Sequence, residues 1–294
     1  MNPLVSIITV TYNRKKLLSD LLFALCHQTY SPVEIIVVDN ASTDGTSAFV
    51  KEQFPGVTLL RMPENFGMVA YNIGMANANG EYILVVDDDG LPGAEWVSEV
   101  VTCFQGNDRL GAVACAIYIH ETGELAEDSA QYVRDVASGE GYPCAAYNGT
   151  GAGIRAEVLR EVGYYPFSYF RSWLEFHLCT RVIDSGWEVR CFPEIVVRHQ
   201  KPPGGVKRTW TYHGLRNYYW YIWTFYPGMH AVGETLHYVG SRVKMVLLGK
   251  LSLPLLARAT ADALFGLPGA LRQRKPIKAR TLRRLRYIRE HGRP

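Results

Sequence analysis

The chain has 294 residues, of which 48% are hydrophobic and 20% charged. This composition is ordinary for a folded globular protein and argues against a disordered chain, and the length allows one large domain or somewhat more. The net charge of +3 hides an asymmetry, because residues 271–294 hold ten Lys or Arg and one acid, whereas the other 270 residues hold 21 basic and 27 acidic residues.

Six cysteines are scattered without a CxxC pair. We expect buried free thiols in a reducing compartment rather than disulfides or a zinc site. The sequence starts without the basic, apolar and small-residue pattern of a secretory leader, so we expect a cytoplasmic protein. No GxGxxG or Walker motif follows a predicted strand, which argues against a dinucleotide or P-loop phosphate site.

Short apolar stretches alternate with stretches of helical periodicity along the first 200 residues. The expected strands are 4–10, 34–38, 57–60, 83–86, 111–119, 187–192 and 195–197, with a break at Pro193. The expected helices are 14–28, about 46–54, 68–79, 96–104, 155–162 and one that ends near 186; residues 120–145 and 148–154 are expected as loops. This alternation predicts an α/β fold with a mostly parallel sheet flanked by helices.

Three aspartates, Asp87, Asp88 and Asp89, follow the strand at 83–86 without a spacer. Because consecutive strand residues point to opposite faces, we expect Asp87 and Asp89 on one side and Asp88 on the other. Carboxylates packed this closely indicate a cation or a strong hydrogen-bond network. The alternative is a solvated acidic turn, since Asp-Gly is a common turn dipeptide.

Two other predicted strands also end in polar residues, at Thr11–Asn13 and at Asp39–Asn40. The carboxyl ends of parallel strands meet at one edge of a sheet, where open α/β folds bind ligands. The sequence therefore predicts that these residues and the three aspartates form one site suited to a nucleotide.

Five motifs occur in order within residues 4–200: VSIITVTYN at 5–13, VVDNASTDG at 37–45, NFG at 65–67, NIG at 72–74 and DDD at 87–89. Together they resemble glycosyltransferase family 2, and the resemblance implies the GT-A nucleotide-diphospho-sugar transferase fold. The chain is most similar to the bacterial rhamnosyltransferase-like branch, which modifies cell-surface polysaccharide or lipid-linked precursors.

The resemblance implies a role for each motif. The nucleotide of a dTDP- or UDP-linked sugar would be held by Thr11, Tyr12, Asn13, Asp39, Asn65, Gly67, Asn72, Asp87 and Asp88. A carboxylate such as Asp39 can accept the imide N–H of a pyrimidine, and Tyr12 can contact the ring; the alternative for Asp39 is a helix-capping acid. Mn²⁺ or Mg²⁺ would be held by Asp87, Asp89 and His199, and the alternative for His199 is a structural role.

Many relatives carry an acidic pair and a third acid where this chain has Leu174-Glu175-Phe176-His177. Glu175 is therefore the expected catalytic base of a single displacement with inversion, and the alternative is a surface glutamate in a first helical turn. Tyr71 stands where many processive relatives have Arg, and no Gln-x-x-Arg-Trp follows residue 200. Both departures argue against a polysaccharide synthase.

We expect a catalytic domain over 1–208 and a helical C-terminal region over 209–294. Aromatic residues crowd 210–228, and cations interrupt the apolar stretch 236–270, so no run reaches the ~18–20 apolar residues of a spanning helix. With the basic tail, this pattern predicts interfacial helices on an anionic membrane, at the inner face of the cell membrane. The alternative is a helical subdomain or a dimer interface. Nucleic-acid binding is disfavoured, since the aromatics lie too far upstream of the tail.

The sequence thus predicts an inverting, metal-dependent glycosyltransferase that acts on a cell-surface glycan or a lipid-linked acceptor. Rhamnose follows only from the branch resemblance, and hexopyranose or galactofuranose donors fit the same residues. The second hypothesis is an inactive relative that binds a nucleotide sugar or a partner enzyme.

Overall fold

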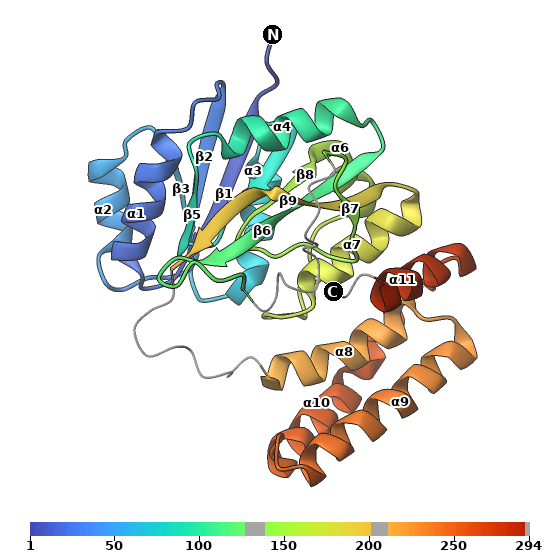
Figure 1. Ribbon diagram of the computed structural model, residues 1–294. Coiled ribbons are helices and arrows are strands. Elements are labelled where there is room, and N and C mark those ends of the chain that lie inside the picture. Colours follow the sequence, from blue (N-terminus) through green and yellow to red (C-terminus); the bar gives the residue numbers. More distant parts are fainter. Residues whose placement is uncertain (127–138, 201–210, 292–294) are drawn as a thin grey trace.

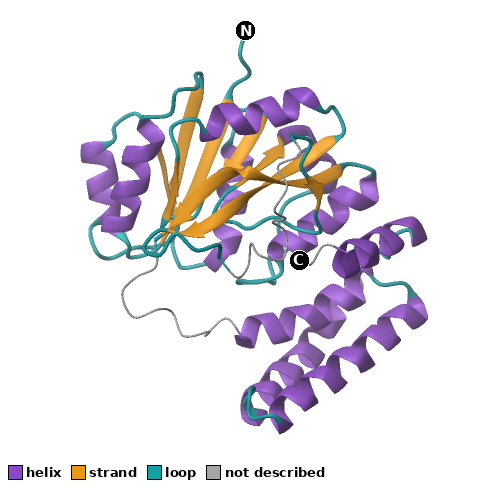
Figure 2. Cartoon of the chain, in the orientation of Figure 1, coloured by secondary structure: helices purple, strands orange, loops and turns teal. Residues whose placement is uncertain are grey.

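The structure is a computed structural model that describes residues 1–126, 139–200 and 211–291. A curled β-sheet with helices on both faces forms one part, and four helices from the end of the chain form a second part beside it (Figures 1 and 2).

The described strands form one nine-stranded sheet in the order β3-β2-β1-β4-β8-β6-β9-β5, with β7 paired to β9. Their bounds are β1 Val5–Thr11, β2 Val33–Asp39, β3 Thr58–Arg61, β4 Tyr82–Val85, β5 Gly90–Pro92, β6 Leu110–Ile119, β7 Tyr142–Pro143, β8 Ala152–Arg155 and β9 Glu188–His199. Strands β1, β2, β3 and β4 are parallel, as the alternating pattern predicted.

The second half of the sheet is mixed: β6 and β9 pair in parallel, but the other strand pairs there do not. Strand β8 pairs antiparallel with both β4 and β6, and β5 and β7 pair antiparallel with β9, so the sheet is mixed. Strand β8 was expected to be a loop, because its Ala-Gly-Ile-Arg sequence has little apolar bulk. The expected break at Pro193 is a bulge inside β9: Cys115 pairs with Phe192, and Ala116 pairs with Val196.

Two apolar cores cover the two faces of the sheet. Helices α1 Lys15–Cys26, α2 Thr46–Gln53 and α4 Trp96–Gly106 pack on one face. The short helix η1 Gly67–Ala70 with α3 Tyr71–Asn77, α6 Ala156–Val162 and α7 Leu174–Ser185 packs on the other. Neighbouring strand residues alternate between the cores, as Ile7 and Ile8 do. All six cysteines are free thiols; four are buried, whereas Cys26 is exposed.

The C-terminal helices are α8 Thr211–Phe225, α9 Gly228–Leu247, α10 Leu253–Arg272 and α11 Ala279–His291. The expected domain boundary at 208 lies outside the described residues. The aromatic side chains of α8 share one core with α7, as Trp173 lies 4.5 Å from Tyr218 and His177 lies 4.6 Å from Phe225 between ring centroids. These α8 side chains are therefore buried against the sheet-containing part and are not the lipid-facing aromatics that the sequence suggested. The described helices include none that is long and apolar enough to cross a membrane.

Candidate active site

The polar ends of β1, β2 and β4 meet at one edge of the sheet, as predicted. Thr11 at the end of β1 pairs with Asp39 at the end of β2, and the Val86 N–H donates to the Ile8 carbonyl at 3.1 Å. The parallel register therefore brings Thr11, Asp39 and the aspartate triplet to the same edge.

The three aspartates do not alternate along a strand, contrary to the expectation. Strand β4 ends at Val85, and the Gly90 N–H donates to the Asp87 carbonyl at 2.8 Å, which closes a turn over 87–90. The turn directs Asp88 and Asp89 toward one guanidinium, whereas the Asp87 carboxylate bonds to the side chains of other elements.

Arg14, which the sequence analysis did not single out, lies between these two carboxylates. Its Nη1 is 2.9 Å from Asp88 Oδ1 and 2.8 Å from Asp89 Oδ2, and the Thr11 hydroxyl donates to Asp88 Oδ2 at 2.8 Å. Burial lowers the pKa of Arg14, but the charges of Asp88 and Asp89 outweigh it and raise this pKa. Burial raises the pKa of Asp88 to about 6, against the lowering effect of Arg14. The single positive charge of Arg14 therefore does not balance the negative charges of the carboxylates in the 87–90 turn.

His199 lies on the other side of Asp89. Its Nε2 is 3.1 Å from Asp89 Oδ1, and the backbone joins the two residues because β5 pairs Gly90 with His199 and the Gln200 N–H donates to the Asp89 carbonyl at 2.8 Å. Burial raises the pKa of Asp89, but the hydrogen bond and charge of His199, with the charge of Arg14, lower it below its ordinary value. The site thus brings together two of the three side chains expected to hold a metal.

Asp87, the third expected ligand, makes its hydrogen bonds with other residues, although the charges of Asp89 and His199 act on it: burial and Asp89 raise its pKa, against the lowering effect of His199. The Asp87 carboxylate accepts hydrogen bonds from the Tyr71 hydroxyl at 3.1 Å and the Thr150 hydroxyl at 2.9 Å. Among the described residues no three His, Cys, Asp or Glu side chains converge as a metal cluster. A carboxylate and an imidazole nitrogen suit Mn²⁺, and the excess negative charge of the turn fits a divalent cation, so Asp89 and His199 are the residues that could hold one.

Glu175, the expected base, approaches the same edge from α7. A methyl group built on Gly149 would lie 3.4 Å from Glu175 Oε1 and 3.7 Å from Asp87 Oδ1. Glu175 and Asp87 therefore converge on the 148–150 loop, and Gly149 leaves the space between them open. The glycine-rich run in this loop was the only sequence signal for that close approach.

The backbone before Glu175 is strained. Ser172 and Trp173 have positive φ angles of 67° and 69°, a conformation that is costly for residues with side chains. The buried side chain of Asn217 in α8 donates to the carbonyls of Arg171 at 2.8 Å and Ser172 at 3.0 Å, and the Trp173 indole donates to the Gly214 carbonyl at 3.1 Å. Helix α8 therefore holds the turn from which Glu175 projects.

Most residues expected to contact the base form hydrogen bonds within the loops after β1 and β2. Asp39 is fully buried and accepts hydrogen bonds from the Ser42 N–H at 2.8 Å and from the Ser47 hydroxyl, which agrees with the alternative of a helix-capping acid in its loop. Asn13 accepts from the Thr43 N–H at 2.7 Å. Tyr12 differs, because 45% of it is exposed and its ring is open to a ligand.

Asn65, Gly67 and Asn72 shape the backbone of the site. Asn65 accepts from the Gly67 N–H at 2.8 Å, and a side chain at Gly67 would lie 2.3 Å from the Phe170 carbonyl oxygen, so only glycine fits there. Asn72 is buried and pairs with both backbone groups of Tyr165, at 2.9 Å and 3.0 Å. The amide of Asn72 thus fixes the segment before α7, and its contact with a nucleotide stays a prediction.

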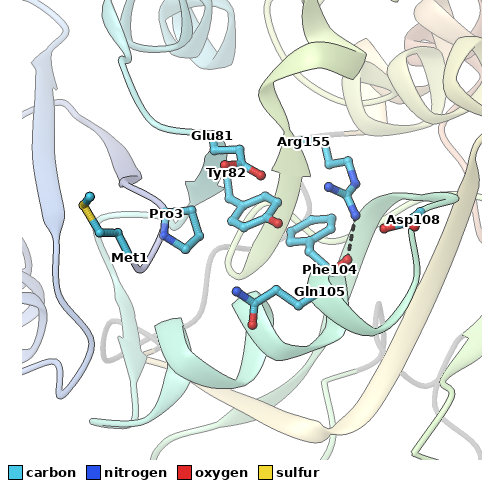
Figure 3. A pocket seen from close by; sticks show the side chains of 8 residues that line it. All are labelled: Met1, Pro3, Glu81, Tyr82, Phe104, Gln105, Asp108 and Arg155. Atoms are coloured by element: carbon cyan, nitrogen blue, oxygen red, sulfur yellow. Dashed lines mark hydrogen bonds between the residues drawn. The ribbon is translucent and has the colours of Figure 1, made fainter.

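A cavity of about 390 Å³ lies at the opposite end of the strands (Figure 3). It is lined by Met1, Pro3, Glu81, Tyr82, Phe104, Gln105, Asp108 and Arg155. Tyr82 begins β4 whereas Asp87 follows its end, so the length of the strand separates this cavity from the carboxylates. The candidate active site does not include it.

The mixed sheet agrees with the GT-A fold that the sequence motifs led us to expect. Residues 6–163, more than half of the chain, match the family described as glycosyl transferase family 2. The protein belongs to this family.

Known proteins of similar sequence are glycosyltransferases. An uncharacterized glycosyltransferase of Haemophilus influenzae is 28% identical over 134 residues, which is 44% of this chain and 42% of that protein, so the match spans less than half of the relative. Glycosyltransferase AglE of Haloferax volcanii is 25% identical over 212 residues, 69% of each chain.

Two solved structures are similar along nearly the whole chain. Mannosyltransferase PcManGT from Pyrobaculum calidifontis, in complex with GDP-Man and Mn²⁺, has a TM-score of 0.62 at 19% identity and covers 99% of this chain and 88% of its own. S. aureus TarS 1–349, in complex with UDP-GlcNAc, has a TM-score of 0.64 at 18% identity, with 98% and 92% covered. At these identities the likeness describes the fold.

Proposed function

We propose that this protein is an inverting, metal-dependent glycosyltransferase that moves a sugar from a nucleoside diphosphate to an acceptor hydroxyl. The observation that carries the proposal is the juxtaposition at one sheet edge of Asp89 with His199 and of Asp87 with Glu175. Asp89 and His199 suit a cation that would bind the diphosphate. Glu175, beside Asp87, supplies a carboxylate next to the place where the sugar would react.

Each group of side chains has a separate task in this proposal. Tyr12 stacks on the nucleobase, while Asp39, Asn13 and Asn65 keep the loops that surround the nucleotide in shape. Asp87 accepts a ribose hydroxyl, a role compatible with the two hydroxyl donors that already face it. When bound at Asp89 and His199, Mn²⁺ or Mg²⁺ supplies positive charge that stabilises the departing diphosphate.

Glu175 acts as the general base. Its carboxylate takes the proton of the acceptor hydroxyl while that oxygen attacks the anomeric carbon from the face opposite the leaving diphosphate, so the configuration inverts. The turn at 171–173 fixes the position of this carboxylate before substrate binds, which is the arrangement a base needs in order to lower the barrier.

The partner molecules follow from the resemblance and the C-terminal helices. We propose a dTDP- or UDP-linked sugar, with rhamnose as the first candidate, and a cell-surface glycan or lipid-linked acceptor at the inner face of the cell membrane. Residues 1–208 would form the catalytic domain, with 209–294 as the helical region that positions it.

A panel of nucleotide sugars tested by calorimetry, with and without Mn²⁺, is the direct test. Tight binding of one donor only with Mn²⁺, followed by transfer with inversion as read by NMR of the anomeric proton, is the expected result. Folded protein that binds a donor but never hydrolyses or transfers it would identify an inactive family member instead.

A further inference from the structure

Exposed apolar side chains are concentrated in the C-terminal helices. Among the residues that the structure describes, eighteen large hydrophobic ones are exposed, and eleven of these lie within 229–271. They are Met229, Val232, Leu236, Val239, Val243, Leu247, Leu248, Leu253, Leu264, Phe265 and Leu271.

Six of these residues form one continuous stripe along α9. The stripe consists of Met229, Val232, Leu236, Val239, Val243 and Leu247, which follow one another at spacings of three or four residues and so lie on one helix face. Met229, Leu236 and Leu247 are 78%, 69% and 81% exposed. We call this set the α9 stripe.

The opposite face of α9 is already packed. Ala231 and Tyr238 are buried, and the Tyr238 ring lies 4.4 Å from Tyr218 and 5.2 Å from Tyr219 of α8 between centroids. The helix therefore has one face in the protein core and one apolar face without a described intramolecular partner, and it cannot leave α8 to cross a bilayer without uncovering the aromatic core.

The C-terminal helices that carry the stripe are mostly positively charged. Residues 211–291 contain fourteen Lys or Arg and three acids, and Lys244 and Lys250 are exposed next to the end of the stripe. Two of the three acids, Glu234 and Asp262, accept hydrogen bonds from the hydroxyls of Tyr218 and Tyr212. A second copy of the chain would oppose these cations with like charge, whereas an anionic lipid surface would attract them.

We propose that the α9 stripe, with the apolar residues of the α9–α10 turn, lies in the interface of an anionic membrane. The apolar side chains enter the acyl boundary, and the lysines reach back to the lipid phosphates. The inference rests on the membrane-associated part of the proposed function and assigns lipid contact to α9 rather than to the aromatic helix α8, which is buried.

The test is flotation of the full chain with vesicles of phosphatidylcholine, alone or mixed with phosphatidylglycerol. We expect binding to the mixed vesicles, and a loss of at least about tenfold in the partition coefficient for the double variant Leu236→Gln/Leu247→Gln, since two exposed leucines no longer enter the lipid. Glutamine is nearly as good a helix former as leucine, so α9 should persist, which circular dichroism checks. The matched control is Phe23→Gln, which removes a 64% exposed apolar side chain from α1 and should leave binding unchanged.

Two results overturn the proposal: no binding of the wild type to anionic vesicles, or equal binding of the double variant. A wild-type dimer in light scattering that the double variant converts to a monomer would assign the stripe to a second copy instead. Calorimetry with the donor nucleotide sugar distinguishes failure of the membrane proposal from failure of the proposed function. The double variant should bind the donor as tightly as the wild type does, whether or not it binds vesicles.

Discussion

The amide nitrogen of Asn217 lies 3.0 Å from the carbonyl oxygen of Ser172 and donates a hydrogen bond to it. This contact joins the C-terminal helix α8 to the strained turn before Glu175, so the helical region is part of the support of the proposed active site. We expect Asn217→Ala to lower the free energy of unfolding by about 1–3 kcal/mol, because two partly buried backbone carbonyls lose their donor.

The same variant should lower the rate of sugar transfer while donor binding by calorimetry stays unchanged, since the carboxylate of Glu175 loses its fixed position. Asn77→Ala is the control, because that exposed amide also donates to a backbone carbonyl but lies at the end of α3. Equal effects of the two variants would mean that Asn217 has no special link to Glu175.

Asp89 and His199 should act as one cation site. We expect Asp89→Asn or His199→Ala to weaken Mn²⁺ binding in the presence of UDP by at least about tenfold, as each variant removes one of two neighbouring ligands. Calorimetry with MnCl₂ measures this, and His120→Ala, an exposed histidine beside the end of β6, is the control. Unchanged Mn²⁺ affinity in both variants would place the metal elsewhere.

Arg14 should stabilise the carboxylate pair in the absence of metal. Removing it in Arg14→Ala leaves Asp88 and Asp89 facing each other, so we expect a loss of about 1–2 kcal/mol in urea unfolding, between the values for exposed and buried ion pairs. Added Mn²⁺ should stabilise the variant more than the wild type, because the cation then supplies the missing positive charge. Lys16→Ala, on the exposed side of α1, should behave as the wild type in both measurements.

Glu175→Gln should separate chemistry from binding. The amide keeps the size of the side chain but cannot take a proton, so we expect transfer to fall by about 10²–10⁴-fold while the donor binds with unchanged affinity. Steady-state rates with a donor that the panel has identified measure the loss. Glu157→Gln, at an exposed position of α6, is the control, and equal rates for both variants would remove Glu175 from the mechanism.

The sequence was sufficient to predict the parallel half of the sheet and the edge where Thr11, Asp39 and the aspartates meet. Buried parallel strands give apolar runs and their helices give periodic leucines, so both signals are local. Strand β8 was missed because Ala152 to Arg155 contains small residues whose strand conformation depends on β4 and β6, which pair with it from distant parts of the chain.

Side-chain partners could not be predicted in the same way. Arg14 and Asp89 lie 75 residues apart in the chain, and nothing in the local pattern of Arg14 distinguishes it from a solvent-exposed arginine. The partner of Asn72 could not be predicted either, because an amide can bind a nucleotide or a backbone segment equally well. Only the fold shows that the backbone of Tyr165 faces Asn72. The aromatic side chains of α8 were also misjudged, because they are buried by α7, which the sequence of α8 alone does not reveal.

His177 should make the stability of the protein fall at acidic pH. Burial, together with the charge of Arg181, lowers the pKa of His177 well below its ordinary value of 6.5, so the folded state holds this imidazole neutral. Below pH 6.5 the unfolded chain binds a proton that the folded chain does not, and the free energy of unfolding falls by up to about 1.4 kcal/mol per pH unit. Urea unfolding at pH 7.5 and pH 5.5 should show a smaller pH-dependent loss for His177→Leu than for the wild type, because the leucine cannot titrate. An identical pH dependence in His177→Leu and the wild type would exclude His177 as its source.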